Sequence, residues 1–431
     1  MREDLLQFIW RYLYFNQSRL ITEAGEELQI LSPGELNTDA GPDFRNARIR
    51  LDDRLREGPV ELHVKASDWD RHGHDSDPNY RGVILHVVWE NDGGPADLPV
   101  LVLQHRVSKL LLGQYEKWMK SQLFVPCAAQ LQQVRTAVID GWKEDLLLRR
   151  LYQRTLVIRD WLSVNCQHWE ETTWWLMARS MGQPVNGMAF EAVARTTPLR
   201  LLARYRSEPA RLKALLLGQA GLLDAAKPGN PSTSMLSTAL RLLPDNDQIQ
   251  RAQQEYRFLQ AKHHLEPIST PILFHRMRPA HTPVRRLVQL AELFSSGESW
   301  FAKLRETGSS GELKAALQAD GLGADMKKGL LINAFVPVLF AYGLLRKEPS
   351  CREKALAWLA AEKPEKNTRI AHWQRLGASV LTAADSQSLL ELKKTYCDNR
   401  RCLDCAIGQN LLGVGPNATT IIRPGELPSS N

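Results

Sequence analysis

Two short segments among the first hundred residues carry side chains that could do chemistry together. One is a Gly-Pro-Asp turn ending in Asp43, and the other is Val60–Lys65, a strand-like run that starts seventeen residues later. Side chains alternate between the two faces of a strand, so Glu61, His63 and Lys65 share one face. Two carboxylates and a nitrogen base can hold a divalent metal and orient a water. These are the fewest groups that metal-assisted cleavage of a phosphodiester bond requires.

The apolar residues of the same run occupy the opposite face, which a sheet normally buries. A carboxylate, an imidazole and an ammonium in a row are costly inside a sheet unless partners satisfy them. An alternative is that the polar row faces solvent on a half-covered sheet and that Asp43 is an ordinary turn residue. The sequence leaves both interpretations open.

A histidine-rich loop follows this run, covering Ser67–His74 and continuing through Asp77 and Tyr80 toward His86. Imidazoles and carboxylates so close in sequence could form a transition-metal site, although the spacing is not that of a known zinc signature. The loop could also be plain polar surface. We expect it to form the rim of the site, with His72 and His74 contacting substrate phosphates.

Short elements must position these residues. Apolar spacing predicts a helix over 3–15, and turn residues separate the predicted strands that follow. The strands are expected at 27–31, 45–51, 59–66, 83–90 and 100–104. From about residue 106 the period is helical, with helices expected at 108–120, 134–160, 172–180, 191–206, 209–223, 248–264, 283–294 and 326–345. A polar Pro/Gly-rich loop is expected at 224–234.

The chain therefore divides into an α/β domain over 1–125, an all-helical domain over 126–412 and a tail over 413–431. A length of 431 residues also favours more than one domain. The first 125 residues carry a net charge of −5 and the remainder +12. Such a basic excess fits a nucleic-acid partner, DNA or RNA, but many soluble proteins carry as much.

Nothing in the sequence favours export or a membrane. Acidic residues stand at the N-terminus, where a secretory signal would carry basic ones. No apolar run approaches the roughly 20 residues that span a bilayer. We expect a cytoplasmic protein.

Pro42-Asp43 on one strand and an acidic-x-basic element on the next resemble the PD-(D/E)XK nuclease superfamily, the restriction-endonuclease-like fold, over about residues 1–105. The resemblance implies a mixed sheet with flanking helices. It makes Asp43 the metal-bridging aspartate and Glu61 the second ligand of magnesium or manganese, with Glu3 as a helix-borne acid. The superfamily's lysine belongs where His63 stands. Lys65 could reach back in its place, or His63 could act as a base or third ligand.

A second resemblance covers essentially the full chain. Residues 37–44, Asp68-Trp69, His72-Gly-His74 and Ile332-Asn333 look like those of an uncharacterised bacterial protein family of unknown function.

Three cysteines lie within nine residues near the C-terminus: Cys397, Cys402 and Cys405. Thiolates at this density suit zinc or an iron–sulfur cluster, and three free cysteines are the alternative. Cys127 is the candidate fourth ligand, with Cys351 and Cys166 as alternatives. Closure by Cys127 would fasten the C-terminal segment to the junction of the domains. That arrangement is similar to the iron–sulfur staple of some RecB-type and CRISPR-associated exonucleases.

Two groups of arginines in the helical domain could follow a phosphate backbone. One runs along residues 146–160 and includes Arg150 and Arg154. The other is expected to bind substrate and comprises Arg276, Arg278, Arg285 and Arg286. The alternative for each group is a solvated or ion-paired helix face.

These features together predict a magnesium- or manganese-dependent nuclease whose basic helical domain grips nucleic acid. Because His63 replaces the lysine, one alternative is a catalytically inactive nuclease-like protein that binds nucleic acid or acts as a scaffold. Another is a metal-dependent hydrolase of a small substrate, built on the histidine-rich loop.

Overall fold

The structure is a computed structural model that describes residues 1–431 except 38, 96, 224–245, 275–281 and 414–431. The predicted loop at 224–234, Arg276, Arg278 and nearly all of the predicted tail lie outside the described residues. The chain forms two units. The α/β unit comprises Met1–Asp145, His372–Ala378 and the described part of Leu390–Asn431, and the helical unit comprises Leu146–Ala371 and Ser379–Leu389.

This division differs from the boundary expected at residue 125. It falls within the long helix α4 (Thr136–Val164), and it assigns the cysteine-rich C-terminal segment to the α/β unit. Sequence periodicity could not show this, because a helical pattern does not reveal which unit a helix packs against.

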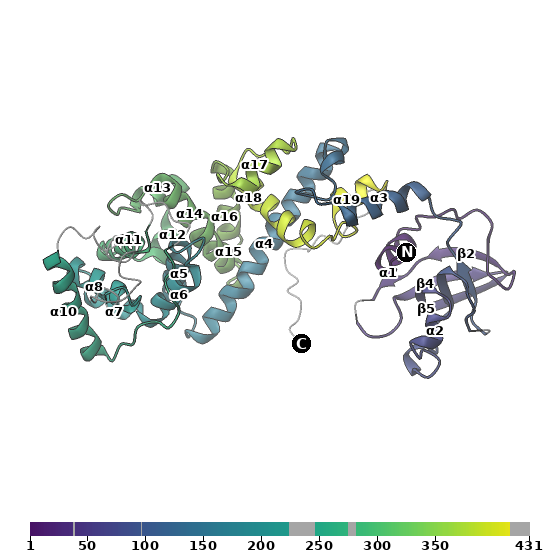
Figure 1. The fold of residues 1–431 in the computed structure, drawn as a ribbon, viewed down its shortest axis with the longest axis horizontal. Helices are drawn as coiled ribbons and strands as arrows, with labels where there is room; N and C mark the ends of the chain where they lie inside the picture. Colours follow the sequence, from purple (N-terminus) through teal and green to yellow (C-terminus); the bar gives the residue numbers. More distant parts are fainter. Residues whose placement is uncertain (38, 96, 224–245, 275–281, 414–431) are drawn as a thin grey trace. The chain divides into compact units, whose positions relative to one another are not determined.

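A single mixed sheet organises the α/β unit (Figure 1). Its strand order is β1-β2-β4-β5-β6-β7, and β3 pairs with β4 off this path. The pairs from β1 to β5 are antiparallel, whereas β5–β6 and β6–β7 are parallel. The strands are β1 (Leu20–Ile21), β2 (Glu27–Ser32), β3 (Glu35–Leu36), β4 (Phe44–Leu51), β5 (Arg54–Lys65), β6 (Leu85–Glu90) and β7 (Val100–Val102). The five predicted strands and the mixed sheet are confirmed.

The alternation of buried and exposed side chains along the sequence explains why these segments form strands. In β4 the buried residues Ala47, Ile49 and Leu51 share one face, and a bulge between Phe44 and Ala47 keeps Phe44 in the core as well. Strand β6 is buried on both faces from Leu85 to Val88, as expected of a central parallel strand. The helix α1 (Glu3–Arg11) packs against β5 through its apolar face.

Most of the other helices of the α/β unit are short, and the exceptions are α3 and the first part of α4. They are α2 (Asp68–Arg71), η1 (Pro78–Tyr80), α3 (Lys109–Lys120), η2 (Ala128–Gln133), η6 (Leu392–Cys397) and α19 (Ala406–Leu411), together with part of α17 (Thr368–Arg375) and the end of α18 (Ala383–Glu391). The core of this unit joins the sheet, α1 and α3, and it also contains Cys402 and Leu412.

The helical unit has its own apolar core. Its helices are α5 (Trp169–Met181), α6 (Gly187–Thr196), α7 (Leu199–Arg204), α8 (Pro209–Gln219), α10 (Asn246–His263), α11 (Pro283–Ser295), α12 (Trp300–Glu306), α13 (Ser310–Ala316), α14 (Ala324–Leu330), η5 (Leu331–Phe335), α15 (Val336–Leu345) and α16 (Pro349–Ala361). The stretch Ala324–Leu345 is long and apolar enough to cross a membrane by length and composition alone. However, 67% of its apolar window is buried, as in the core helix of a soluble protein.

Several arginines expected to reach nucleic acid are held inside the helical unit instead. Arg150 Nε donates to Gln387 Oε1 at 2.7 Å, and Arg154 Nη2 donates to Asn333 Oδ1 at 3.0 Å. Arg286 is only 6% exposed and donates to Gln289, and burial, then Arg285, lowers its pKa to about 10. The substrate-binding role expected for Arg286 is therefore wrong. Arg285 remains partly exposed.

Candidate functional site

A tight turn places Asp43 at the start of β4. Gly41 has a φ of +104°, which a residue with a side chain rarely adopts. The turn is closed by Asn37, whose backbone N–H donates to the Asp43 carbonyl at 2.7 Å and whose side chain donates to the Pro42 carbonyl at 2.9 Å. The carboxylate of Asp43 is thus directed by fixed backbone.

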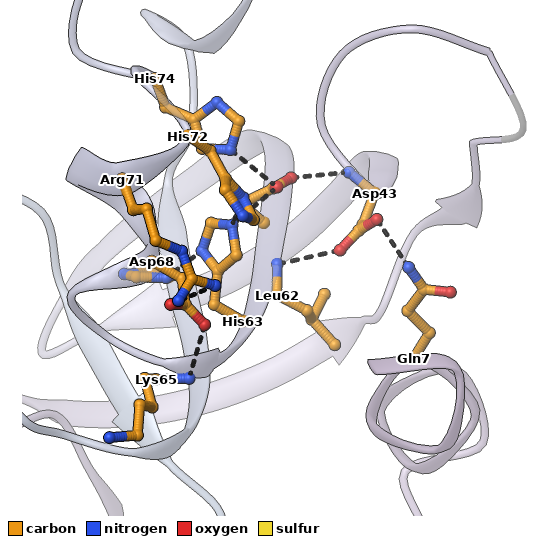
Figure 2. A network of polar contacts seen from close by, with 11 residues as sticks. Gln7, Asp43, Leu62, His63, Lys65, Asp68, Arg71, His72 and His74 are labelled. Atoms are coloured by element: carbon orange, nitrogen blue, oxygen red, sulfur yellow. Dashed lines mark hydrogen bonds and ion pairs between the residues drawn. The ribbon is translucent and has the colours of Figure 1, made fainter. Parts of the chain in front are cut away.

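Asp43 and Glu61 lie side by side, as predicted, and Figure 2 shows Asp43 beside Leu62 and Gln7. The Asp43 backbone N–H donates to Glu61 Oε2 at 2.9 Å, and the Leu62 N–H donates to Asp43 Oδ2 at 3.1 Å. Helix α1 contributes Gln7, whose amide donates to Asp43 Oδ1 at 2.8 Å. The two acids are therefore locked to each other through the backbone of two neighbouring strands.

The Asp43 and Glu61 carboxyl groups are partly shielded from solvent and repel one another. Burial, then repulsion from Asp43, raises the pKa of Glu61 to about 8. Burial, then Glu3, raises the pKa of Asp43 to about 6. Glu3 at the start of α1 thus lies within electrostatic reach of both, in agreement with its expected place as a helix-borne acid. A bound cation would relieve this repulsion.

Three histidines converge on Glu61 from the other side. His63 Nε2 and His74 Nε2 each lie 3.5 Å from Glu61 Oε1, and His72 Nδ1 lies 3.2 Å from His63 Nε2. One ligand atom from each histidine lies within 4.8 Å of those of the other two. No other group of three potential ligand residues meets this criterion within the described part of the chain. We call Glu61, His63, His72 and His74 the Glu-His group.

The loop that carries His72 and His74 is held by contacts beyond the strand. Lys65 N–H donates to Asp68 Oδ2 at 3.3 Å, which begins the turn into α2. The Trp69 indole donates to Asp75 at 2.7 Å. The His74 ring stacks on Tyr80 with centroids 3.8 Å apart. These contacts fold the loop over β5, so His74 Nε2 faces Glu61 and His72 Nδ1 faces His63, while His72 stays exposed to solvent.

The protonation of the histidines suits metal binding. Burial, then His86 and the other histidines, lowers the pKa of His63 to about 3, and burial, then His74, lowers the pKa of His86 to about 4. Both rings are therefore neutral at physiological pH, and a neutral imidazole is the form that binds a metal. His74 Nε2 is buried and has no hydrogen-bond partner among the described residues.

The spacing of the Glu-His group fits one metal ion. Ligands about 2.0–2.1 Å from a tetrahedral centre stand about 3.3 Å from one another. The His72–His63, His63–Glu61 and His74–Glu61 separations of 3.2, 3.5 and 3.5 Å are close to this value, and the ligand atoms of the three histidines all lie within 4.8 Å of one another. Imidazole-rich sets suit first-row transition ions such as zinc or manganese better than magnesium. His72 is exposed, so the site opens to solvent on its side.

This geometry revises the expected roles of His72 and His74. Both belong to the group that could hold a metal, as the alternative transition-metal interpretation required, and His72 also lies at the solvent-exposed edge of that group. The third ligand expected among the histidines, His63, lies among them.

Lys65 does not join the site. Its Nζ lies 3.5 Å from Asp92, its side chain is 52% exposed, and it points away from the histidines (Figure 2). The strand β5 ends at this residue, so the alternation that brings Glu61 and His63 together no longer directs its side chain. The expectation that Lys65 reaches back is wrong.

We therefore expect Lys65→Ala to leave metal affinity and activity within about twofold of wild type. An exposed ion pair contributes at most about 1 kcal/mol to stability, so the fold should also tolerate the change. Manganese titration and turnover of the variant test this. A tenfold loss of either would place the Lys65 ammonium in the site after all.

His86 supports the group from behind. Its Nε2 lies 2.9 Å from His63 Nδ1, so a proton on His63 Nδ1 leaves His63 Nε2 free to face the metal. We expect His86→Phe to weaken manganese binding about 10- to 100-fold, the usual effect of losing such an outer partner. His86→Gln, which restores an acceptor, should recover part of the loss. Equal affinity of His86→Phe and wild type would remove this positioning role.

A pocket beside α1 was not expected from the sequence. It has a volume of about 350 Å³ and includes Gln7, which also bonds to Asp43. Four arginines line it, Arg2, Arg11, Arg400 and Arg401, together with the two aspartates Asp4 and Asp404. The arginines come from the two ends of the chain, so no local pattern could have signalled them.

Comparison with known proteins gave one match. Residues 3–368 match the model of a family described as "Protein of unknown function (DUF2851)". No curated protein and no solved structure matched the chain. The expected resemblance to a family of unknown function is confirmed, whereas the resemblance to the nuclease superfamily stays a prediction.

Proposed function

Since the chain belongs to this family of unknown function, we propose from its own site that it is a metal-dependent nuclease that cleaves phosphodiester bonds. One observation carries the proposal. The Glu61 carboxylate accepts from the Asp43 backbone N–H and lies 3.5 Å from two of three imidazoles that have the spacing of metal ligands.

Each residue has a part in this proposal. Glu61, His63, His72 and His74 would hold a transition ion such as manganese or zinc in place of the magnesium expected from the sequence. When bound, such an ion polarises the phosphate and lowers the pKa of a coordinated water. Asp43, whose pKa of about 6 lies near working pH, is placed to accept a proton at Oδ1 or Oδ2.

The order of elements supports the nuclease interpretation. Helix α1 is followed by antiparallel β2, β4 and β5 and by parallel β6, and the acids come from α1, the start of β4 and the middle of β5. This is the arrangement that the restriction-endonuclease-like resemblance implies. His63 stands where that superfamily has lysine and would replace its charge with a metal ligand.

The substrate is proposed to be nucleic acid in the cytoplasm. The arginine-lined pocket shares Gln7 with the site, and arginine suits phosphate. Two of its arginines are engaged by carboxylates, Arg2 with Asp4 at 2.8 Å and Arg401 with Asp404 at 3.0 Å. A phosphate would compete with those aspartates for the arginines. Because arginine–phosphate contacts release counterions from nucleic acid, binding should weaken as salt concentration rises.

A second candidate is a transition-metal hydrolase of a small substrate, which the three histidines favour over a magnesium nuclease. The two candidates differ in salt dependence, because a small substrate releases few counterions.

The direct test is to incubate labelled single- and double-stranded DNA and RNA with the protein and manganese, zinc or magnesium. We expect cleavage with manganese or zinc and none with Asp43→Asn. If every oligonucleotide remains whole with every metal, the nuclease proposal fails. Hydrolysis of a small phosphodiester alone would support the second candidate.

A further inference from the structure

A second set of potential ligands lies in the α/β unit, apart from the Glu-His group. It comprises four of the six cysteines of the chain: Cys127, Cys397, Cys402 and Cys405. All four are free thiols. Cys127 immediately precedes η2, whereas the other three lie between the end of η6 and the start of α19.

Packing brings these two segments together. Helix α19, which starts directly after Cys405, contacts η2, which starts directly after Cys127. Cys402 is part of the core of the α/β unit, and Cys127 packs against that core. The Arg400 guanidinium donates to the carbonyls of Trp118 and Ser121 at the end of α3, which fixes the segment that carries the cysteines.

The four thiols lie within reach of one another. Cys402 and Cys405 are only 8% and 7% exposed, and the other two are partly buried. Burial, then Cys405 and Cys402, raises the pKa of Cys127 to about 12. Burial, then Cys405, Cys127 and Cys402, raises the pKa of Cys397.

The backbone around Cys405 is arranged for a charged sulfur. Burial raises the pKa of Cys405, and hydrogen bonds from the N–H groups of Gly408 and Ile407 to this residue oppose that rise. Gly408 permits this approach, because a Cβ at this position would lie 2.1 Å from the Cys402 carbonyl oxygen. The loop between Cys397 and Cys402 turns at Arg400, which has a φ of +55°.

We propose that Cys127, Cys397, Cys402 and Cys405 hold a thiolate-bound metal centre that fastens the C-terminal segment to the α/β unit. Four thiols from two segments, two of them buried and two partly buried, match the Cys₄ ligand sets of structural zinc and of iron–sulfur clusters. Binding releases the four thiol protons to solvent and changes no oxidation state of sulfur. The proposal is independent of the nuclease function, because none of these cysteines belongs to the Glu-His group.

The separation of the sulfur atoms bears on which centre fits. Four thiolates about 2.3 Å from one zinc ion stand about 3.8 Å apart. No three of these sulfurs lie within 4.8 Å of one another, since only the histidine trio meets that test among the described residues. In an iron–sulfur cluster the four thiolates are divided among two or four irons, so no three of the sulfur ligands need to stand close together. We therefore expect an iron–sulfur cluster, formed with iron and inorganic sulfide, rather than zinc.

The test is to purify the full chain without oxygen and to measure iron, acid-labile sulfide and zinc per chain. We expect iron and sulfide with a visible absorption that dithionite bleaches. Cys397→Ser and Cys402→Ser should retain less than about a tenth of the wild-type metal. Two control variants should keep all of it: Cys166→Ser, which changes an exposed cysteine, and Cys351→Ser, which changes a buried cysteine of the helical unit.

Alkylation of the wild-type protein tests the proposal even if the cysteine variants fail to fold. The four cysteines should resist alkylation in the native protein, while Cys166 reacts, and they should become reactive when the metal is removed. Zinc in place of iron would support the four-thiolate centre and overturn the cluster. Absence of all three elements, with the four thiols alkylated as fast as Cys166, would overturn the centre itself.

Discussion

Replacing Glu61 with glutamine should lower the rate of metal-dependent cleavage by on the order of 10³-fold, since a catalytic metal contributes several kcal/mol to the transition state. Glu61 is the one residue that contacts both halves of the site, with Oε2 on the Asp43 backbone and Oε1 facing His63 and His74. The amide keeps the volume of the side chain but loses the charge that binds a cation. Manganese affinity, measured by calorimetry, should fall together with the rate.

The matched control is Glu57→Gln, which makes the same change at an exposed position of the same strand. It should leave rate and affinity unchanged. Asp43→Asn should lose cleavage while retaining most of the manganese affinity, because Asp43 lies beside the Glu-His group and is not a member of it. If Glu61→Gln cleaved at the wild-type rate, the Glu-His group would have no part in the cleavage mechanism.

The pairing of Asp43 with Glu61 could be predicted because it depends on local rules. Alternation fixes the face of Glu61 and His63 within β5, and the Gly41 turn fixes the start of β4. Antiparallel pairing of β4 with β5 then brings Asp43 beside Glu61, with Phe44 opposite Val60. Each step needs only the neighbouring strand.

The roles of Lys65, His72 and His74 could not be predicted in the same way. Lys65 ends its strand, where alternation stops and an ion pair with Asp92 directs the side chain. The loop brings His74 to Glu61 and His72 to His63, and the Trp69–Asp75 hydrogen bond and the stacking of Tyr80 on His74 hold it there. A two-residue spacing of histidines in a loop does not reveal such contacts.

The packing of the C-terminal segment in the α/β unit could be predicted only in part. Sequence spacing indicated three clustered thiols, and Cys127 was expected to join them because it stands near the junction. The structure brings Cys127 into electrostatic reach of the other three. What the sequence could not show is that Arg400 and Arg401 also reach α1 and line its pocket, since that depends on packing between the two ends of the chain.

Metal affinity should rise steeply with pH because the ion must displace a proton from Glu61. Burial and Asp43 raise the pKa of this carboxyl to about 8, so it is protonated below that pH in the metal-free protein. His63, with a pKa of about 3, is neutral throughout and does not compete. Manganese affinity should therefore increase about tenfold per pH unit, or about 100-fold from pH 6 to pH 8, and level off above pH 8.

The same linkage predicts how stability responds to pH. A carboxyl whose folded pKa is raised stabilises the fold below its unfolded pKa of 4.5, and this contribution is lost as pH rises through about 8. The rise in melting temperature on adding manganese should thus be larger at pH 8 than at pH 6. Calorimetry in buffers of different ionisation enthalpy should show about one proton released per ion at pH 6–7. Lys65→Ala should keep this dependence of manganese affinity on pH, and Glu61→Gln should flatten it. If the affinity of the wild type does not change with pH, manganese binds without displacing the Glu61 proton. The Glu-His group would then not be its site.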